Sequence, residues 1–207
     1  MGGDYTLMYF PVRGRVEAAR YILAQANIPY KMEVVTREEW ANRKAECPMG
    51  QMPVLKHGNH VLCQSMAIAR YFAREAGLVG ADACEQAQAD MYVDGVSDLF
   101  GSFKDVVMAV FSKPDTVKDV YAKFKSEALK PWMDKYQAFL EKNGTGYFVG
   151  KQLTWADLTV AEFMNRLKLC FDLTVLDGHP SLKKHHDMVH ALPNIKAYCD
   201  GRPEYKL

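Results

Sequence analysis

The first part of the chain contains two patterns of apolar and polar residues, one typical of strands and one typical of helices. Residues 5–10 form a short β-rich run that ends at a proline, and residues 15–27 place their apolar side chains on one face of a helix. Residues 30–35 again resemble a strand, so the order predicts a βαβ unit with parallel strands and a right-handed crossover. The polar stretch 36–45, which begins with a threonine, predicts a short capped helix.

The next stretch, residues 50–77, predicts a hairpin that runs into a helix. Residues 54–56 and 60–63 are strand-like and flank the turn cluster His57-Gly58-Asn59. Apolar residues then recur at helical spacing from Ser65, and Gly77 is a suitable residue for ending that helix. The expected order is therefore β-α-β-α-β-β-α, which predicts an α/β domain with a mixed sheet over residues 1–79.

The pattern changes after residue 80, where every periodic segment is helical. Pro131 is expected to bend the second helix or to mark its last stretch, and Thr154 to Asp157 has the pattern of a capping box. The sequence predicts an all-α domain over residues 80–207. The expected helices cover residues 84–112, 116–142, 155–170, 180–191 and 194–200.

Composition narrows the class of protein. The 207 residues are 49% hydrophobic and 25% charged, which is typical of a soluble globular chain. A formal net charge of +1 argues against nucleic-acid and polybasic membrane binding, and no apolar run is long enough for a transmembrane helix. The five cysteines are scattered and form no C-x-x-C pair, so we expect reduced thiols, no metal and a cytoplasmic protein.

Residues 50–71 also suggest a binding site. Gln64 and Ser65 lie where a helix should begin, and the free N–H groups and positive dipole there attract an anion. The Met52-Pro53 bond is one that adopts the cis form at low cost, which would turn the Met52 backbone toward an extended ligand. An ordinary hairpin followed by an ordinary capped helix explains the same residues about equally well.

The α/β part has a thioredoxin-like outline, but it lacks the cysteine that redox members carry between the first strand and the first helix. That position holds Tyr9 and the arginines of the Arg13-Gly14-Arg15 loop. A phenol and a guanidinium near a helix N-terminus suit the stabilisation of an anion that another molecule provides.

Four segments together carry a family resemblance: YTLMYFPVRGRVEAARYILA, CPMGQMPVL, QSMAIARYFA and LTWADL. In this order and spacing they resemble a cytosolic glutathione S-transferase of the sigma-like group, which includes invertebrate enzymes and glutathione-dependent prostaglandin D synthases. The resemblance covers essentially the whole chain. It implies that the first domain binds glutathione as a co-substrate, that the helical domain builds the pocket for hydrophobic electrophiles, and that two identical subunits form a dimer.

By motif position, the resemblance gives Tyr9 the role of donating its hydroxyl to the glutathione sulfur, and Arg15 that of adding positive potential and orienting Tyr9. A free thiol titrates near ~8.5, so only a small fraction is thiolate at neutral pH. Hydrogen bonding to the thiolate lowers its pKa and activates the nucleophile. The alternative for Tyr9 is a strand tyrosine that packs in the core.

The resemblance also implies the contacts that hold glutathione. Gln64 and Ser65 would bind the γ-glutamyl carboxylate, and the Met52 backbone would pair with the cysteinyl backbone. Asp98 would reach the γ-glutamyl amine bound to the partner subunit. The full set of expected glutathione contacts is Tyr9, Trp40, Lys44, Gln51, Met52, Pro53, Gln64, Ser65 and Asp98. Packing or surface roles are the alternatives for Trp40, Lys44 and Asp98.

The expected electrophile pocket consists of Phe10, Val12, Phe100, Phe103, Phe163 and Leu207. Met49 would insert as an apolar key between helices of the partner. Cys47 lies beside the site and could be a reactive thiol, although an inert thiol is the favoured alternative. Three other functions stay open: a carrier of haem or other hydrophobic ligands with secondary conjugating activity, a prostaglandin isomerase, and a structural protein like the lens crystallins. The presence of Tyr9, Gln64, Ser65 and Asp98 argues against the structural role. Asp105 stands near the position of a tryptophan in the prostaglandin D synthases, which weighs against the isomerase.

Overall fold

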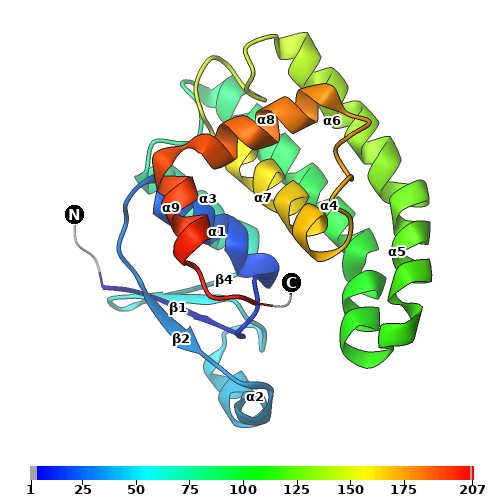
Figure 1. The fold of residues 1–207 in the computed structure, drawn as a ribbon. Helices are drawn as coiled ribbons and strands as arrows, with labels where there is room; N and C mark the ends of the chain where they lie inside the picture. The colour runs from blue at the N-terminus through cyan, green and yellow to red at the C-terminus, as the bar shows by residue number, and fades with distance from the viewer. Residues whose placement is uncertain (1–3, 206) are drawn as a thin grey trace. The chain divides into compact units, whose positions relative to one another are not determined.

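A computed structural model describes residues 4–205 and 207, and its ribbon is shown in Figure 1. Four strands form one mixed sheet in the order β2-β1-β3-β4. β1 runs parallel to β2 and antiparallel to β3, and β3 pairs antiparallel with β4 across the predicted hairpin. The strands are β1 (Tyr5–Tyr9), β2 (Lys31–Val34), β3 (Val54–His57) and β4 (His60–Cys63).

Three helices follow the strands in the predicted order: α1 (Glu17–Gln25), α2 (Arg37–Arg43) and α3 (Ser65–Glu75). α1 and α3 pack against each other, and their apolar faces are fully buried. Thr36 caps α2 as expected, because its hydroxyl accepts a hydrogen bond from the Glu39 amide while the Glu39 carboxylate accepts one from the Thr36 amide. The predicted thioredoxin-like order β-α-β-α-β-β-α is confirmed.

The remaining chain is helical, as predicted. The helices are α4 (Ala83–Ser112), α5 (Val117–Phe124), α6 (Lys130–Asn143), α7 (Trp155–Cys170), α8 (Pro180–Ala191) and α9 (Pro193–Gly201). The expected capping box is present at the start of α7, where the buried Asp157 carboxylate accepts hydrogen bonds from both the amide and the hydroxyl of Thr154. None of the helices in the described ranges has both the length and the apolar character that a membrane crossing requires.

The effect of Pro131 is seen in the turn just before it, and not as a bend within one continuous helix. α5 and α6 are joined by a π-helical turn over Lys125–Leu129, and Pro131 is the second residue of α6. A proline has no N–H for the carbonyl four residues before it, and its ring crowds that carbonyl, so the backbone absorbs an extra residue in the preceding turn.

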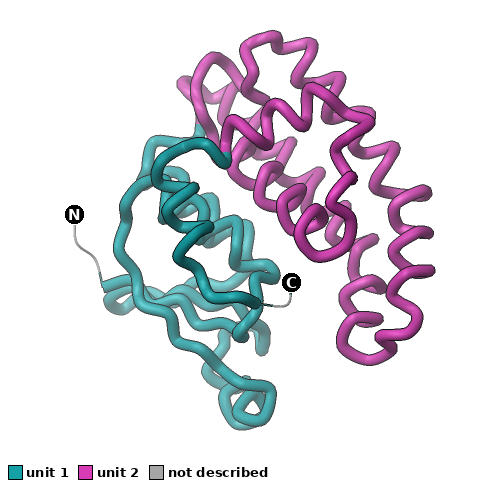
Figure 2. The backbone as a smooth tube through the Cα atoms, in the orientation of Figure 1, with its two compact units in different colours: residues 1–79, 190–207 teal, residues 80–189 magenta. Residues whose placement is uncertain are grey.

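The chain divides into two compact units, coloured separately in Figure 2. The second unit covers residues 80–189, and the first combines residues 1–79 with residues 190–207. The sequence pattern places residues 190–207 in the helical domain, whereas in the structure α9 packs on α1. The helical periodicity of α9 shows that it has an apolar face but not which partner covers it.

Candidate functional site

The strand register brings several predicted site residues to one edge of the sheet. Tyr9 ends β1 and pairs with Val34 at the end of β2. Met8 pairs with Val54 at the start of β3, and Val54 pairs with Cys63 at the end of β4. The connections that leave this edge therefore carry the Tyr9–Arg15 loop, α2, the Met52-Pro53 bond and the start of α3.

Tyr9 is buried at this edge, with a side chain that leads toward the start of α1. Its hydroxyl oxygen accepts a hydrogen bond of 2.9 Å from the Arg15 backbone amide. A hydroxyl that accepts such a bond becomes a stronger donor for its own hydrogen. The family resemblance assigns the orienting role to the Arg15 side chain, which is exposed; the bond in the structure comes from its main chain.

Gly14 is a part of this arrangement that was not predicted from the sequence. Its φ is +48°, and a Cβ built on it would lie 2.5 Å from the Tyr9 hydroxyl oxygen and 2.8 Å from a ring carbon. The glycine backbone therefore lies against the phenol, where no larger residue fits without movement. The one sequence feature that could have indicated the role of Gly14 is its place between two arginines just before a helix.

The Arg13–Gly14 loop is also held from the far end of the chain. The Leu207 carbonyl accepts hydrogen bonds from the amides of Arg13 and Gly14, and Leu207 itself is buried. The neighbouring Val12 carbonyl accepts a bond from Arg20 at 3.2 Å. The predicted pocket residues Val12 and Leu207 thus both belong to the support of this loop.

The segment after α2 lies close to the same edge. Trp40, Met52 and Cys63 pack around one small apolar cluster that includes Met8 and the buried Cys47. The Trp40 ring also meets Phe10, at 5.6 Å between ring centroids. Phe10, Trp40 and Met52, three of the predicted site residues, therefore lie together here. Burial raises the pKa of the Cys47 thiol, which keeps it protonated at neutral pH.

The start of α3 provides the predicted anion position. Gln64 is the N-cap residue with φ +74°, a conformation that costs about 1–3 kcal/mol for a residue other than glycine and concentrates at functional sites. The Gln64 side chain does not cap this helix, so the first amides of α3 point toward the open N-terminus. The Gln64 amide nitrogen lies 3.2 Å from the Met49 sulfur, and Ser65 is buried as the first helical residue.

The other expected contacts in the first unit are more open. Lys44 and Gln51 are exposed, and the Lys44 stem passes close to Gly50. The Met52–Pro53 peptide bond is cis.

The remaining predicted residues belong to the second unit. Phe100, Phe103 and Phe163 are buried and form one aromatic cluster, with ring centroids 4.7 Å apart for Phe100 and Phe163 and 5.7 Å apart for Phe103 and Phe163. They are core residues of the helical unit as described, and their pocket role stays a prediction. Asp98 is exposed on α4.

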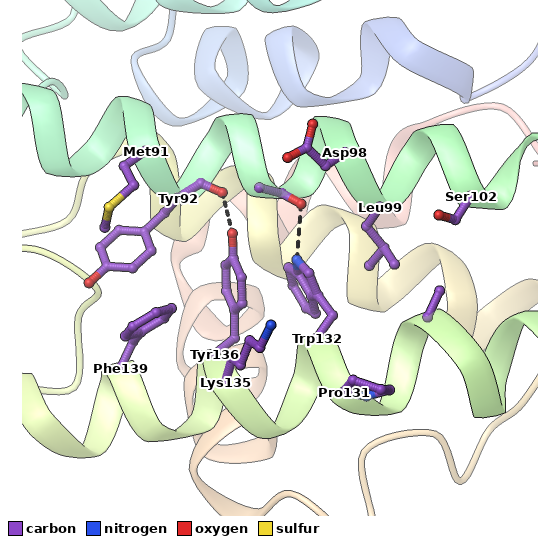
Figure 3. A pocket seen from close by; sticks show the side chains of 12 residues that line it. Met91, Tyr92, Asp98, Leu99, Ser102, Pro131, Trp132, Lys135, Tyr136 and Phe139 are labelled. Atoms are coloured by element: carbon purple, nitrogen blue, oxygen red, sulfur yellow. Dashed lines mark hydrogen bonds between the residues drawn. The ribbon is translucent and has the colours of Figure 1, made fainter.

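Asp98 borders a cavity of about 400 Å³ between α4 and α6 (Figure 3). The Trp132 and Tyr136 rings stack at 3.7 Å, and both side chains donate hydrogen bonds to carbonyls of α4. Gly95 permits this close approach, since a Cβ there would collide with the Tyr136 hydroxyl. Met91 and Phe139 add apolar surface at one end of the cavity.

Comparisons with known protein families match both parts of the chain. Residues 5–74 match the model described as glutathione S-transferase, N-terminal domain, and residues 102–202 match glutathione S-transferase, C-terminal domain. Glutathione S-transferase 1 of Ascaris suum is 36% identical over 207 residues, covering 97% of this chain and 98% of the relative.

Solved structures give the same result. A monomeric glutathione S-transferase of the hookworm Necator americanus is 32% identical with a TM-score of 0.92, covering 99% of this chain and 100% of that one. Prostaglandin synthase D of Nilaparvata lugens is 29% identical with a TM-score of 0.86, covering 97% of this chain and 100% of that one. The likeness therefore extends over both units of the fold.

Proposed function

Because the chain belongs to the glutathione S-transferase family, we propose that it transfers glutathione to hydrophobic electrophiles through a thiolate that Tyr9 stabilises. The observation that carries this role is the hydrogen bond from the Arg15 amide to the Tyr9 hydroxyl. That bond fills an acceptor position of the phenol oxygen and directs the hydroxyl hydrogen toward another acceptor. A glutathione sulfur placed at the sheet edge would be that acceptor.

The proposed chemistry concerns the charge on sulfur. A thiol with a pKa near ~8.5 is only a few per cent ionised at pH 7, and each unit of lowering is about 1.4 kcal/mol. A hydrogen bond to a charged group contributes about 1.5–3 kcal/mol, so one phenol donor accounts for one to two units. The proton leaves to solvent, the thiolate attacks the electrophile, and a carbon–sulfur bond replaces the bond to the leaving group.

The rest of the tripeptide has matching positions in the first unit. The γ-glutamyl carboxylate would accept hydrogen bonds from the amides that open α3, beside Gln64 and Ser65, where the helix dipole favours negative charge. The Met52 backbone before Pro53 would pair with the cysteinyl main chain as an added strand does. Trp40, Lys44 and Gln51 would hold the glycyl end, with the exposed Lys44 supplying a positive charge.

The test is conjugation of glutathione to chlorodinitrobenzene by the wild type and by Tyr9→Phe. We expect kcat/KM to fall about tenfold or more, equivalent to ~1.4 kcal/mol of transition-state stabilisation. Tyr5→Phe is the matched control, because Tyr5 is in the same strand and each of the two tyrosines is 7% exposed. Equal activity of Tyr9→Phe and wild type would rule out the proposed role.

We further propose that the chain acts as a homodimer, with the α4–α6 cavity receiving Met49 from a second copy. Met49 is 61% exposed and therefore accessible to a second copy, and the cavity offers aromatic surface that suits a thioether. Asp98, at the border of that cavity, would then approach the γ-glutamyl amine bound to the partner.

The oligomeric state of this chain needs a direct test, because the Necator americanus relative is described as monomeric. Met49→Asp should shift the chain from dimer to monomer in analytical ultracentrifugation, because it would bury a carboxylate in an apolar site. Leu173→Asp is the control, since Leu173 is 72% exposed and lies away from the cavity lining. A wild type that sediments as a monomer would refute the dimer.

A second candidate function is glutathione-dependent prostaglandin isomerisation. It is favoured by the full-length likeness to prostaglandin synthase D of Nilaparvata lugens. Turnover of prostaglandin H to the D isomer, measured beside conjugation, would decide between them. The compared relatives give no support to the haem-carrier hypothesis, and a haem titration without a saturable spectral shift would end it.

A further inference from the structure

The first unit contains a second cavity that the proposed transfer reaction does not use. It measures about 430 Å³, within the range of small-molecule sites, and lies between α1, β2, α9 and the segment after α9. None of the residues assigned to glutathione borders it. Its lining is Glu17, Arg20, Tyr30, Met32, Ala197, Tyr198, Gly201, Arg202, Pro203 and Tyr205.

Charged groups with almost no solvent exposure line this cavity. The Glu17 carboxylate accepts hydrogen bonds from Arg20 at 2.9 Å, Arg202 at 2.8 Å and the Tyr198 hydroxyl at 3.0 Å. The exposed fractions of the three charged side chains are 1% for Glu17, 4% for Arg20 and 7% for Arg202. Two guanidinium groups therefore share one carboxylate, so the charged side chains among the described lining residues carry one net positive charge at a buried location.

The same two arginines keep hydrogen-bonding capacity after binding Glu17. The second terminal nitrogen of Arg20 has the Met32 sulfur as its partner at 3.6 Å, and a thioether is a weak acceptor. The Arg202 Nε is buried and has no hydrogen-bond partner among the residues that the structure describes. Buried donors of this kind are costly unless an acceptor satisfies them.

The walls of the cavity are aromatic and apolar. Tyr30, Tyr198 and Tyr205 contribute phenol rings, and Met32 and Pro203 contribute apolar surface. Burial raises the pKa of Tyr30, so this phenol stays protonated and offers a hydroxyl donor at neutral pH. The ring of Tyr205 lies 5.9 Å from the Arg20 guanidinium carbon, which orders an aromatic face beside the charge.

From these observations we propose that this cavity binds a planar aromatic carboxylate. The net positive charge of the lining matches a monoanion, the Arg20 nitrogen whose partner is a thioether matches a carboxylate oxygen, and the tyrosine rings match a flat apolar body. The ligand would sit apart from Tyr9 and from the start of α3. The site is thus a second, non-substrate site whose occupancy does not depend on glutathione.

The test uses para-trifluoromethylbenzoate as the probe and fluorine NMR as the measurement, on the full chain saturated with S-hexylglutathione. We expect saturable broadening of the probe signal that persists with the glutathione site occupied. The neutral amide of the same acid should bind about tenfold more weakly or worse, because it forfeits charge-assisted hydrogen bonds.

Two variants localise the binding. Gly201→Trp places a large side chain at the cavity lining, where a Cβ meets no atom within 4 Å, and should weaken probe binding about tenfold by occlusion. Asp200→Trp, the matched control, adds the same side chain to the neighbouring exposed residue outside the lining and should leave binding unchanged. Ala197→Trp repeats the occlusion from the previous turn of α9, in case Gly201→Trp does not fold.

Three results would each overturn the proposal: displacement of the probe by S-hexylglutathione, equal binding of the acid and its neutral amide, or unchanged binding to the folded occlusion variants. Loss of conjugation in Tyr9→Phe has no bearing on this outcome, so the two proposals fail independently.

Discussion

Replacing Gly14 by alanine tests whether the backbone behind Tyr9 sets the position of its hydroxyl. The added Cβ would lie 2.5 Å from the hydroxyl oxygen, about 0.9 Å inside the 3.4 Å at which ordinary contact begins. The phenol is a rigid ring on a buried strand, so the loop or the ring must move by a comparable distance. Either movement changes the bond from the Arg15 amide to the Tyr9 hydroxyl.

The expected magnitude has two parts. Holding an L-residue at a φ of +48° costs about 1–2 kcal/mol of stability, whatever its neighbours. Misplacing a catalytic group by about 1 Å costs up to ~100-fold in rate. We therefore expect a folded protein whose kcat/KM for conjugation falls about 10- to 100-fold, with a higher pKa of bound glutathione in an ultraviolet titration of the thiolate.

Gly58→Ala separates the two parts. Gly58 has φ +54° in the β3–β4 turn, and a Cβ there meets no atom within 4 Å. This variant should lose similar stability in thermal melts and keep its conjugation rate. The reasoning is refuted if Gly14→Ala keeps the wild-type rate and thiol pKa, or if Gly58→Ala loses activity to the same extent.

Three further outcomes are expected. Gly95→Ala should lower the free energy of unfolding, measured in denaturant melts, by about 1–3 kcal/mol, because its Cβ collides with the Tyr136 hydroxyl. Gly101→Ala on the same helix is the control: its Cβ meets open space, so it should raise the free energy of unfolding by ~0.5–1 kcal/mol. Burial lowers the pKa of His186, so below about pH 6.5 the unfolded chain binds more protons than the folded chain. The free energy of unfolding should therefore decrease as the pH falls below this value, and His186→Gln should reduce that pH dependence. Arg15→Ala should reduce kcat/KM only ~5-fold or less, because the backbone amide that binds the phenol remains; a loss as large as that of the phenol variant would show that the side chain acts directly.

Local patterns were enough to predict the elements and their order. The alternation and helical periodicity of the chain depend on which side of each element is buried, and a sequence records that directly. The capping residues Thr36 and Thr154 act within one turn of their helices, so their roles were also visible. The edge position of Tyr9 was not predicted, because it depends on the strand order β2-β1-β3-β4 and on the register, which only the structure shows.

Contacts between distant segments were not predictable in this way. Nothing within one turn of Gly14 indicates that a phenol five residues earlier lies on its backbone, or that the Leu207 carbonyl binds its amide. The sequence predicted an orienting role for the charged Arg15 side chain, whereas the hydrogen bond to the phenol oxygen comes from the Arg15 backbone N–H, a group that every residue except proline has. Residue type predicts side-chain chemistry, and backbone geometry appears only with the fold.

The first unit is built from two segments that are far apart in the sequence, and this affects the order in which the chain folds during synthesis on the ribosome. Glu17 is made early, but two of its partners, Tyr198 and Arg202, follow 181 and 185 residues later. When residues 1–79 have emerged, the carboxylate has Arg20 but not the groups that complete its burial. The second unit, continuous over residues 80–189, is translated in full before the first can close. We therefore expect the helical unit to reach its native contacts before the last segment of the first unit has been synthesised.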